Sequence, residues 1–96
     1  MFYVYFIQSR KDDKMYIGVT SDLKKRLQEH NNGKNTSTKY RIPFTLIYYE
    51  AYLSFKDAIK REKKLKQFKN SYKELKKRIF YSLSGSRKVV GGLTEL

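Results

Sequence analysis

Short apolar and aromatic stretches alternate along the chain with polar, lysine-rich segments, and each stretch has the period of one kind of element. Residues 2–7 (FYVYFI) are β-prone and apolar at successive positions, which is typical of a central strand buried on both faces. Residues 14–19 and 44–52 predict two further strands, and polar residues 8–13 join the first two as an antiparallel hairpin. Gly18 weakens the second strand, so it marks a bulge or a close approach by another group.

Helices are predicted between and after these strands. Ser21 is a candidate N-cap for a helix over about residues 22–30, which Asn31-Asn32-Gly33 ends. Ser54-x-x-Asp57 resembles a capping box that opens a helix to about residue 68, and Ser71-x-x-Glu74 opens another through about residue 81.

The order strand, strand, helix, strand, helix, helix predicts an α+β fold in which helices flank a three-stranded antiparallel sheet. One domain is expected over residues 1–81. Residues 82–96 contain serine, glycine and little apolar content, so we expect a mobile C-terminal tail there.

Charge and composition narrow the choice of partner. Lys and Arg number 22 against nine Asp and Glu, and the resulting net charge of +13 predicts a polyanion, DNA above all, with RNA still open. The basic residues do not lie opposite a strongly apolar helix face, so no membrane partner is expected. No apolar stretch is long enough to span a bilayer and no signal-peptide pattern is present, so a cytoplasmic location is expected.

Metal chemistry is restricted as well. The chain has no cysteine and a single histidine, which excludes disulfides, thiolate zinc sites and His-rich metal sites. Any bound ion would be held by carboxylate, phosphate and water, the ligands of Mg²⁺ or Mn²⁺.

Glu62 is the acid whose position needs an explanation. Glu62 lies within the apolar stripe of its predicted helix, which consists of Ala58, Ile59, Leu65 and Phe68. Burying a carboxylate there costs free energy unless it binds a cation or forms an ion pair. The candidate ion-pair partners are Arg61, Lys66 and Arg26.

Four other residues are candidates for phosphate chemistry. Arg26 and His30 are four positions apart, so they share one helix face and can contact a phosphate or transfer a proton; the alternative is a solvated basic run with a helix-terminal His. Tyr5 and Tyr16 lie on neighbouring predicted strands, where phenols either pack in the core or act as a general base.

Taken in order, these positions resemble the GIY-YIG nuclease family. Tyr3-Val4-Tyr5 and Tyr16-Ile17-Gly18 resemble the paired half-motifs, the first with Tyr and Val where the family name has Gly and Ile. Residues 22–33, with Arg26 and His30, resemble the family's arginine helix, and residues 58–66 resemble the segment with its metal-binding Glu. The similarity covers residues 2 to about 80 and extends to the nuclease domain of the bacterial excision-repair incision subunit.

The resemblance implies a GIY-YIG fold and an endonuclease that cleaves DNA with one divalent cation, in repair or recombination. Glu62 would be the only protein carboxylate on the metal, Arg26 would stabilise transition-state charge, and His30 would relay a proton. Tyr5 or Tyr16 would activate the attacking water. The alternative is a basic nucleic-acid-binding protein of the same fold with little or no catalysis. The sequence leaves the substrate structure, the oligomeric state and partner proteins open.

Overall fold

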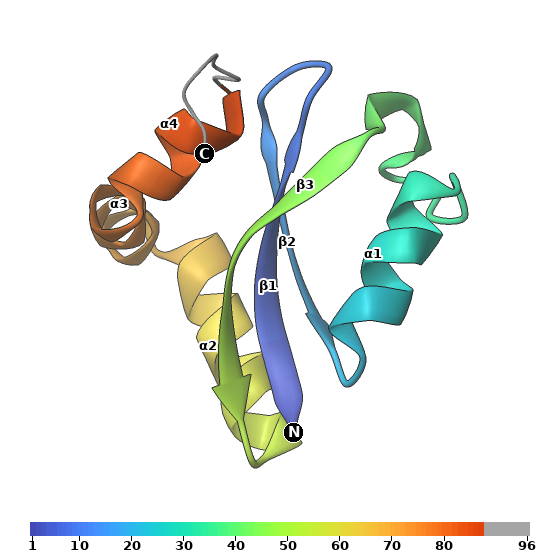
Figure 1. Ribbon diagram of the computed structural model, residues 1–96. Coiled ribbons are helices and arrows are strands. Elements are labelled where there is room, and N and C mark those ends of the chain that lie inside the picture. The colour runs from blue at the N-terminus through green and yellow to red at the C-terminus, as the bar shows by residue number, and fades with distance from the viewer. Residues whose placement is uncertain (88–96) are drawn as a thin grey trace.

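A three-stranded antiparallel sheet lies at the centre of the fold (Figure 1). In the computed structural model, which describes residues 1–87, β1 (Phe2–Ser9) pairs on one side with β2 (Met15–Thr20) and on the other with β3 (Phe44–Tyr52). The strand order β2-β1-β3 makes β1 the central strand, as its apolar residues on both faces predicted. The predicted α+β class and the antiparallel hairpin are confirmed.

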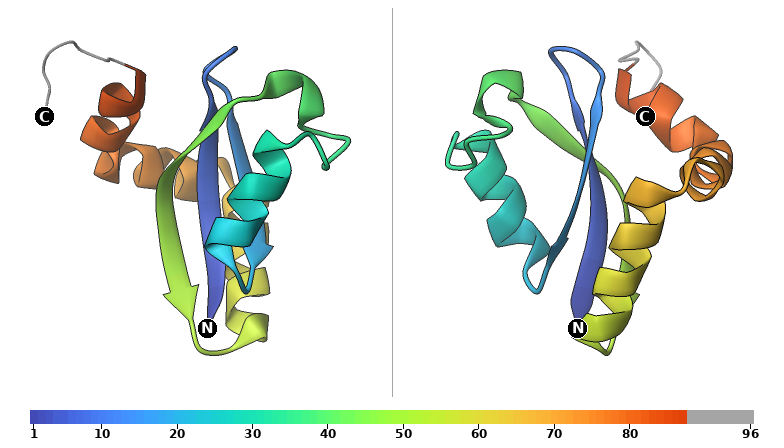
Figure 2. Two further views of the ribbon diagram at one scale, coloured as in Figure 1. Left: turned by 45° about the vertical axis from the view of Figure 1, so that its right-hand side comes forward. Right: turned by 180° about the vertical axis from the view of Figure 1, so that it is seen from behind.

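Helices cover both faces of this sheet (Figures 1 and 2). One face carries α1 (Leu23–Asn31), and the other carries α2 (Phe55–Gln67), α3 (Lys69–Arg78) and α4 (Phe80–Arg87). Within residues 1–87, no helix is long and apolar enough to cross a membrane.

Because side chains alternate along a strand, β1 contributes to two separate cores. Val4 and Phe6 are buried on the face covered by α2 and α3, together with Leu75. Tyr5 and Ile7 are buried on the opposite face, against α1. The same alternation puts Tyr16 of β2 on the α1 face and its neighbours 15 and 17 on the other, as predicted.

Two of the three predicted helix starts need correction. Asp22, not Ser21, caps α1, because its Oδ1 accepts the N–H of Lys25 at 3.0 Å. Ser54 caps α2 as predicted, accepting the N–H of Lys56 at 3.2 Å. The capping box predicted at Ser71 does not open α3, because helix resumes at residue 69 directly after an extended residue 68.

The C-terminal helix also differs from the prediction. The helix expected to run through residue 81 is interrupted at Ile79, so it forms two helices, α3 and α4. Helical structure therefore extends past Ser82, where the tail was expected to begin. Residues 88–96 of the expected tail lie outside the described part of the chain. Phe68, predicted in the apolar stripe of α2, is exposed at the joint between α2 and α3.

Glu50 of β3 anchors α2 to the sheet. Arg61 of α2 binds its two carboxylate oxygens through Nε and Nη2, at 2.8 and 3.0 Å. The hydroxyls of Tyr48 and Tyr52 donate to the same carboxylate at 2.7 and 2.6 Å. Despite partial burial, these donors hold the pKa of Glu50 below its ordinary value, and burial and the carboxylate raise that of Tyr52 to about 12. This cluster fixes the helix that carries Glu62.

We predict that Glu50→Gln lowers the free energy of unfolding at pH 7 by about 1.5–3 kcal/mol, because charge-assisted hydrogen bonds are lost. A carboxyl whose folded pKa is lowered stabilises the fold above its ordinary pKa, and that contribution disappears as the pH falls through the lowered value. Urea unfolding at several pH values should therefore show the variant approaching the wild type in acid. Glu74→Gln, at a carboxylate whose side chain is 75% exposed, is the matched control.

Candidate active site

The side chain of Tyr5, on the central strand β1, extends over the neighbouring strand β2. Tyr5 lies opposite Gly18 in the β1–β2 pairing, and the register is regular there, without a bulge. A Cβ at Gly18 would come within 3.0 Å of three atoms of the Tyr5 ring. Gly18 therefore marks a close approach, one of the two outcomes that the sequence left open.

The hydroxyl of Tyr5 joins the sheet to α1. It lies 3.0 Å from Nε2 of His30 and accepts a hydrogen bond from Nε of Arg26 at 3.4 Å. The i, i+4 spacing of Arg26 and His30 puts both side chains over this phenol, as the shared helix face predicted. Arg26 also pairs with Glu29 through Nη1 at 3.2 Å.

His30 is fully buried and has a partner on each ring nitrogen. Its Nδ1 lies 2.8 Å from Oγ1 of Thr38, which in turn lies 3.5 Å from the carbonyl oxygen of Asn35. The Thr38 hydroxyl donates to the carbonyl oxygen of Asn35, so its Oγ1 accepts from His30 and the imidazole hydrogen is assigned to Nδ1. Nε2 is then an acceptor, and Tyr5, which accepts from Arg26, donates its own hydrogen to Nε2.

Both central groups are uncharged in this arrangement. Burial lowers the pKa of His30, and the positive charge of Arg26 lowers it further. Burial raises the pKa of Tyr5, and the hydrogen bond from Arg26 opposes part of that rise. The site therefore contains a neutral phenol that donates to a neutral imidazole, which is a ready path for a proton.

Tyr16 connects this network to α2. Its ring packs against the His30 ring, with centroids 5.0 Å apart, and against Tyr5 at 6.3 Å. Nζ of Lys66 lies 5.9 Å from the centroid of the same ring. No described residue forms a hydrogen bond with the Tyr16 hydroxyl, so it can contact water or a substrate.

Glu62 approaches the same place from α2. Its carboxylate pairs with Lys66 at 3.0 Å, and its side chain is only 18% exposed. Its negative charge is among the groups that raise the pKa of Tyr5, so it lies within electrostatic reach of the phenol. The ion pair with Lys66 is one of the partners proposed from sequence, whereas Arg61 pairs with Glu50 instead.

The fold thus brings the five predicted residues together from four elements: Tyr5 on β1, Tyr16 on β2, Arg26 and His30 on α1, and Glu62 on α2. Two hollows flank Arg26, with volumes of about 430 and 360 Å³. The first has Lys34 and Glu29 beside Arg26, so its lining is net cationic and suits a phosphate group. In the second, Asp22 and Glu29 balance Lys25 and Arg26.

The sequence did not identify Thr38, which holds the second nitrogen of His30. It lies in the polar segment between α1 and β3, and a single hydroxyl in such a segment gives no signal of burial. Asn31 was recognised only as part of a helix stop, but its amide also binds the backbone N–H and carbonyl of Phe44 at 2.6 and 3.1 Å. These contacts hold the C-terminal end of α1 against β3.

Among the described residues no cluster of three or more His, Cys, Asp or Glu could hold a metal by itself. Glu62 offers one carboxylate, paired with the lysine that contacts the Tyr16 ring. Mg²⁺ commonly takes one or two carboxylates and completes its shell with water and substrate phosphate, so the donor set fits such an ion.

Known proteins resemble this chain in sequence and in fold. Residues 1–78 match the family model described as the GIY-YIG catalytic domain. Two UPF0213 proteins of Streptococcus pyogenes, from serotypes M5 and M2, are each 40% identical over 74 residues, which cover 76% of this chain and 79% of theirs. The solution NMR structure of a UPF0213 protein from Bacillus halodurans is 28% identical, with a TM-score of 0.53 over 94% of this chain and 100% of that one.

We predict that Gly18→Ala lowers the free energy of unfolding by about 1–3 kcal/mol, because the new methyl group overlaps the Tyr5 ring. Tyr5→Leu provides the background for a double-mutant cycle, since leucine lacks the distal ring atoms that approach Gly18. In that background the same substitution should cost less than about 0.5 kcal/mol in urea unfolding. Equal costs in both backgrounds would contradict the close approach.

We predict that His30 titrates below the ordinary histidine pKa of about 6.5 and carries its hydrogen on Nδ1 when neutral. His30 is the single histidine, so one ¹³C–¹H and ¹⁵N NMR titration measures both properties without ambiguity. Since the pKa of His30 is lower in the folded than in the unfolded state, the free energy of unfolding should decrease as the pH falls from the ordinary histidine pKa through the lowered one. A midpoint above the ordinary value, or a hydrogen on Nε2, would contradict the arrangement.

Proposed function

Because this chain belongs to the GIY-YIG catalytic domain family, a family of nucleases, we propose that it is an endonuclease that hydrolyses DNA phosphodiester bonds with one divalent cation, Mg²⁺ or Mn²⁺. The observation that supports this most directly is that the Tyr16 ring contacts His30, the partner of Tyr5, and also Lys66, the partner of Glu62. A base, a cation for the phosphate and a metal-binding carboxylate are the groups that the reaction needs.

Arg26 binds and neutralises the phosphate. Its side chain is partly exposed between the two hollows, while its Nε is held by Tyr5 and its Nη1 by Glu29. A guanidinium fixed in this way is oriented before the substrate arrives, and it favours the additional negative charge of the transition state.

Tyr5 and His30 move the proton. The Tyr5 hydroxyl donates to a neutral imidazole, so it can pass its hydrogen to Nε2 as it takes one from water. Thr38 fixes the imidazole in the tautomer that leaves Nε2 as an acceptor. Tyr16, whose hydroxyl is not engaged by the described residues, orients the attacking water.

Glu62 would hold the divalent ion, in place of its ion pair with Lys66. When bound, such an ion stabilises negative charge on the phosphate oxygens as a Lewis acid. The net charge of +13 supports affinity for DNA that depends on backbone phosphates and not on base sequence. A structure- or damage-directed role in repair or recombination follows from that lack of sequence reading.

A second function is favoured by one observation. Lys66 already neutralises Glu62, so a protein that binds nucleic acid without cleaving it would tolerate the carboxylate. A protein that only binds nucleic acid does not need the hydrogen-bonded Tyr5–His30 pair, so we prefer the nuclease function.

We predict that Glu62→Ala reduces metal-dependent nicking of DNA about 100-fold or more but leaves DNA affinity within about two-fold, because the carboxylate serves the ion and not the phosphate backbone. Nicking is measured on labelled branched, gapped and plain duplexes with Mg²⁺ or Mn²⁺, and affinity by fluorescence anisotropy in EDTA.

Glu74→Ala is the matched control, because it removes an exposed carboxylate from α3 with the same change of net charge. It should nick as the wild type does. Strong binding with no cleavage by the wild-type protein on any substrate would instead support the second function.

A further inference from the structure

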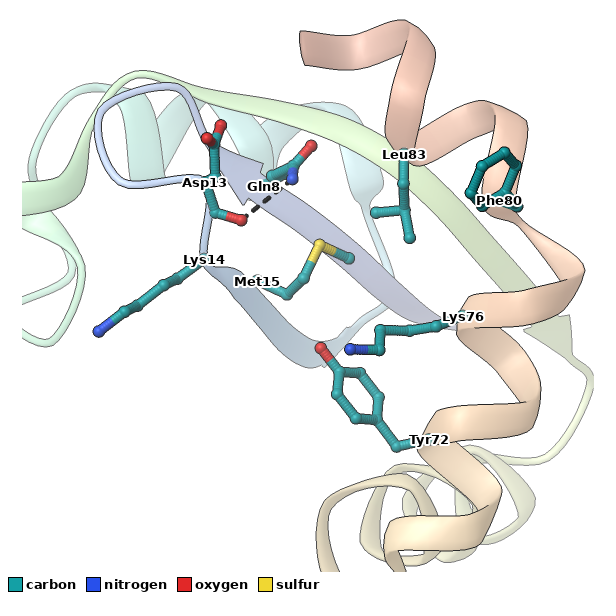
Figure 3. Close-up of a pocket in the computed structure, with 8 residues that line it drawn as sticks. All are labelled: Gln8, Asp13, Lys14, Met15, Tyr72, Lys76, Phe80 and Leu83. Atoms are coloured by element: carbon teal, nitrogen blue, oxygen red, sulfur yellow. Dashed lines mark hydrogen bonds between the residues drawn. The ribbon is translucent and has the colours of Figure 1, made fainter.

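A groove opens on the α3–α4 side of the molecule, away from Arg26 (Figure 3). It lies between the β1–β2 hairpin and the last two helices and has a volume of about 650 Å³, within the range of pockets that hold small organic groups. Its walls combine apolar surface from Met15 and Leu83 with the lysines Lys14 and Lys76. We call it the hairpin groove.

The hairpin groove adjoins the proposed active site. A second hollow of about 320 Å³ lies along β2 and contains Tyr16 and Lys66. Met15 and Tyr72 line both the hollow and the groove, so the two form one path along the outer edge of β2. A strand that starts beside Glu62, the partner of Lys66, can therefore continue toward α4.

Charge and aromatic surface alternate along this path. Lys76 places its Nζ 5.0 Å from the centroid of the Tyr72 ring, which also stacks on Phe6 with centroids 6.0 Å apart, so the Tyr72 ring is already engaged by the protein. Phe80 offers a ring that is 59% exposed. The one acid on the wall, Asp13, contributes its backbone carbonyl to Gln8 at 3.0 Å, and Figure 3 shows its carboxylate on the side away from Tyr72.

We propose that the hairpin groove binds unpaired nucleotides of the DNA strand whose phosphate lies at the active site. Lysines spaced along a groove contact successive phosphates, and an exposed aromatic ring stacks on a base whatever its identity. The bases of an intact duplex are hidden in the stack, so only an unpaired strand can use the apolar wall. This proposal rests on the proposed nuclease function and gives it a substrate class: duplex with a flap, gap or overhang next to the cleaved bond.

The test compares two pairs of substitutions that remove the same chemical groups. Lys76→Ala with Phe80→Ala removes one lysine and one ring from the groove. Lys77→Ala with Phe68→Ala removes one lysine and one phenylalanine ring from positions that do not line it, where the side chain of Lys77 is 71% exposed and Phe68, like Phe80, is 59% exposed.

The probes separate bases from phosphates. Anisotropy in EDTA is measured with blunt duplexes, with duplexes that have 5′ or 3′ thymidine overhangs, and with matching abasic overhangs. The wild type should bind at least one thymidine overhang more tightly than its abasic form. The groove variant should lose about ten-fold affinity for that overhang and its preference over the abasic form, with blunt-duplex affinity unchanged. The control variant should retain both.

Each other outcome overturns the proposal in a recognisable way. Equal affinity for thymidine and abasic overhangs would show that the groove contacts phosphates and not bases. Equal losses in the groove and control variants would show an effect of net charge alone. A changed oligomeric state in the groove variant, measured by light scattering, with overhang binding intact, would make the groove an interface between copies.

The nuclease function is tested separately in the same samples. Absence of metal-dependent nicking by the wild type, with the overhang preference present and lost only in the groove variant, would contradict the nuclease and leave the groove assignment in place. Metal-dependent nicking by a wild type that shows no overhang preference would contradict the groove assignment and leave the nuclease function in place.

Discussion

The passage of the Tyr5 ring over Gly18 is the contact on which the site depends. Tyr5 comes from the central strand, and only an absent side chain on β2 lets its hydroxyl reach α1. There it meets both Arg26 and His30. The ends of α1 are also tied to the sheet, by the amide of Asn31 at one end and by hydrogen bonds between Thr20 and Asp22 at the other. One residue thus sets the distance between sheet and helix, the orientation of the guanidinium and the partner of the imidazole.

The central strand supports this contact from behind. Its alternate residues Val4 and Phe6 pack under α2 and α3, so the strand that presents Tyr5 is fixed by an apolar core on the opposite face. Glu50 and Arg61 attach α2 to the same sheet, and the next residue along that helix is Glu62. A small domain buries little surface, so these polar contacts help the core to hold α2 in a fixed position on the sheet.

Local signals predicted the elements, and contacts distant in sequence decided the rest. Strand periodicity gave the sheet order, and the glycine in β2 indicated a close approach without naming Tyr5 as the group. The Ser71 capping box does not act as a helix start, because the helix resumes at residue 69, directly after the extended Phe68, and Ser71 lies inside α3. Thr38 could not be found, since its burial depends on how the segment after α1 folds back over His30.

The two tyrosines are chemically the same, and their strands make them different. Tyr5 lies on the central strand, its ring is buried, and its hydroxyl contacts both Arg26 and His30. Tyr16 lies on the edge strand, where its ring contacts His30 of α1 and Lys66 of α2. A phenol hydrogen-bonded to a proton acceptor suits proton transfer, whereas an edge phenol suits contact with water and substrate. The strand order is therefore the basis on which we propose different roles for the two tyrosines.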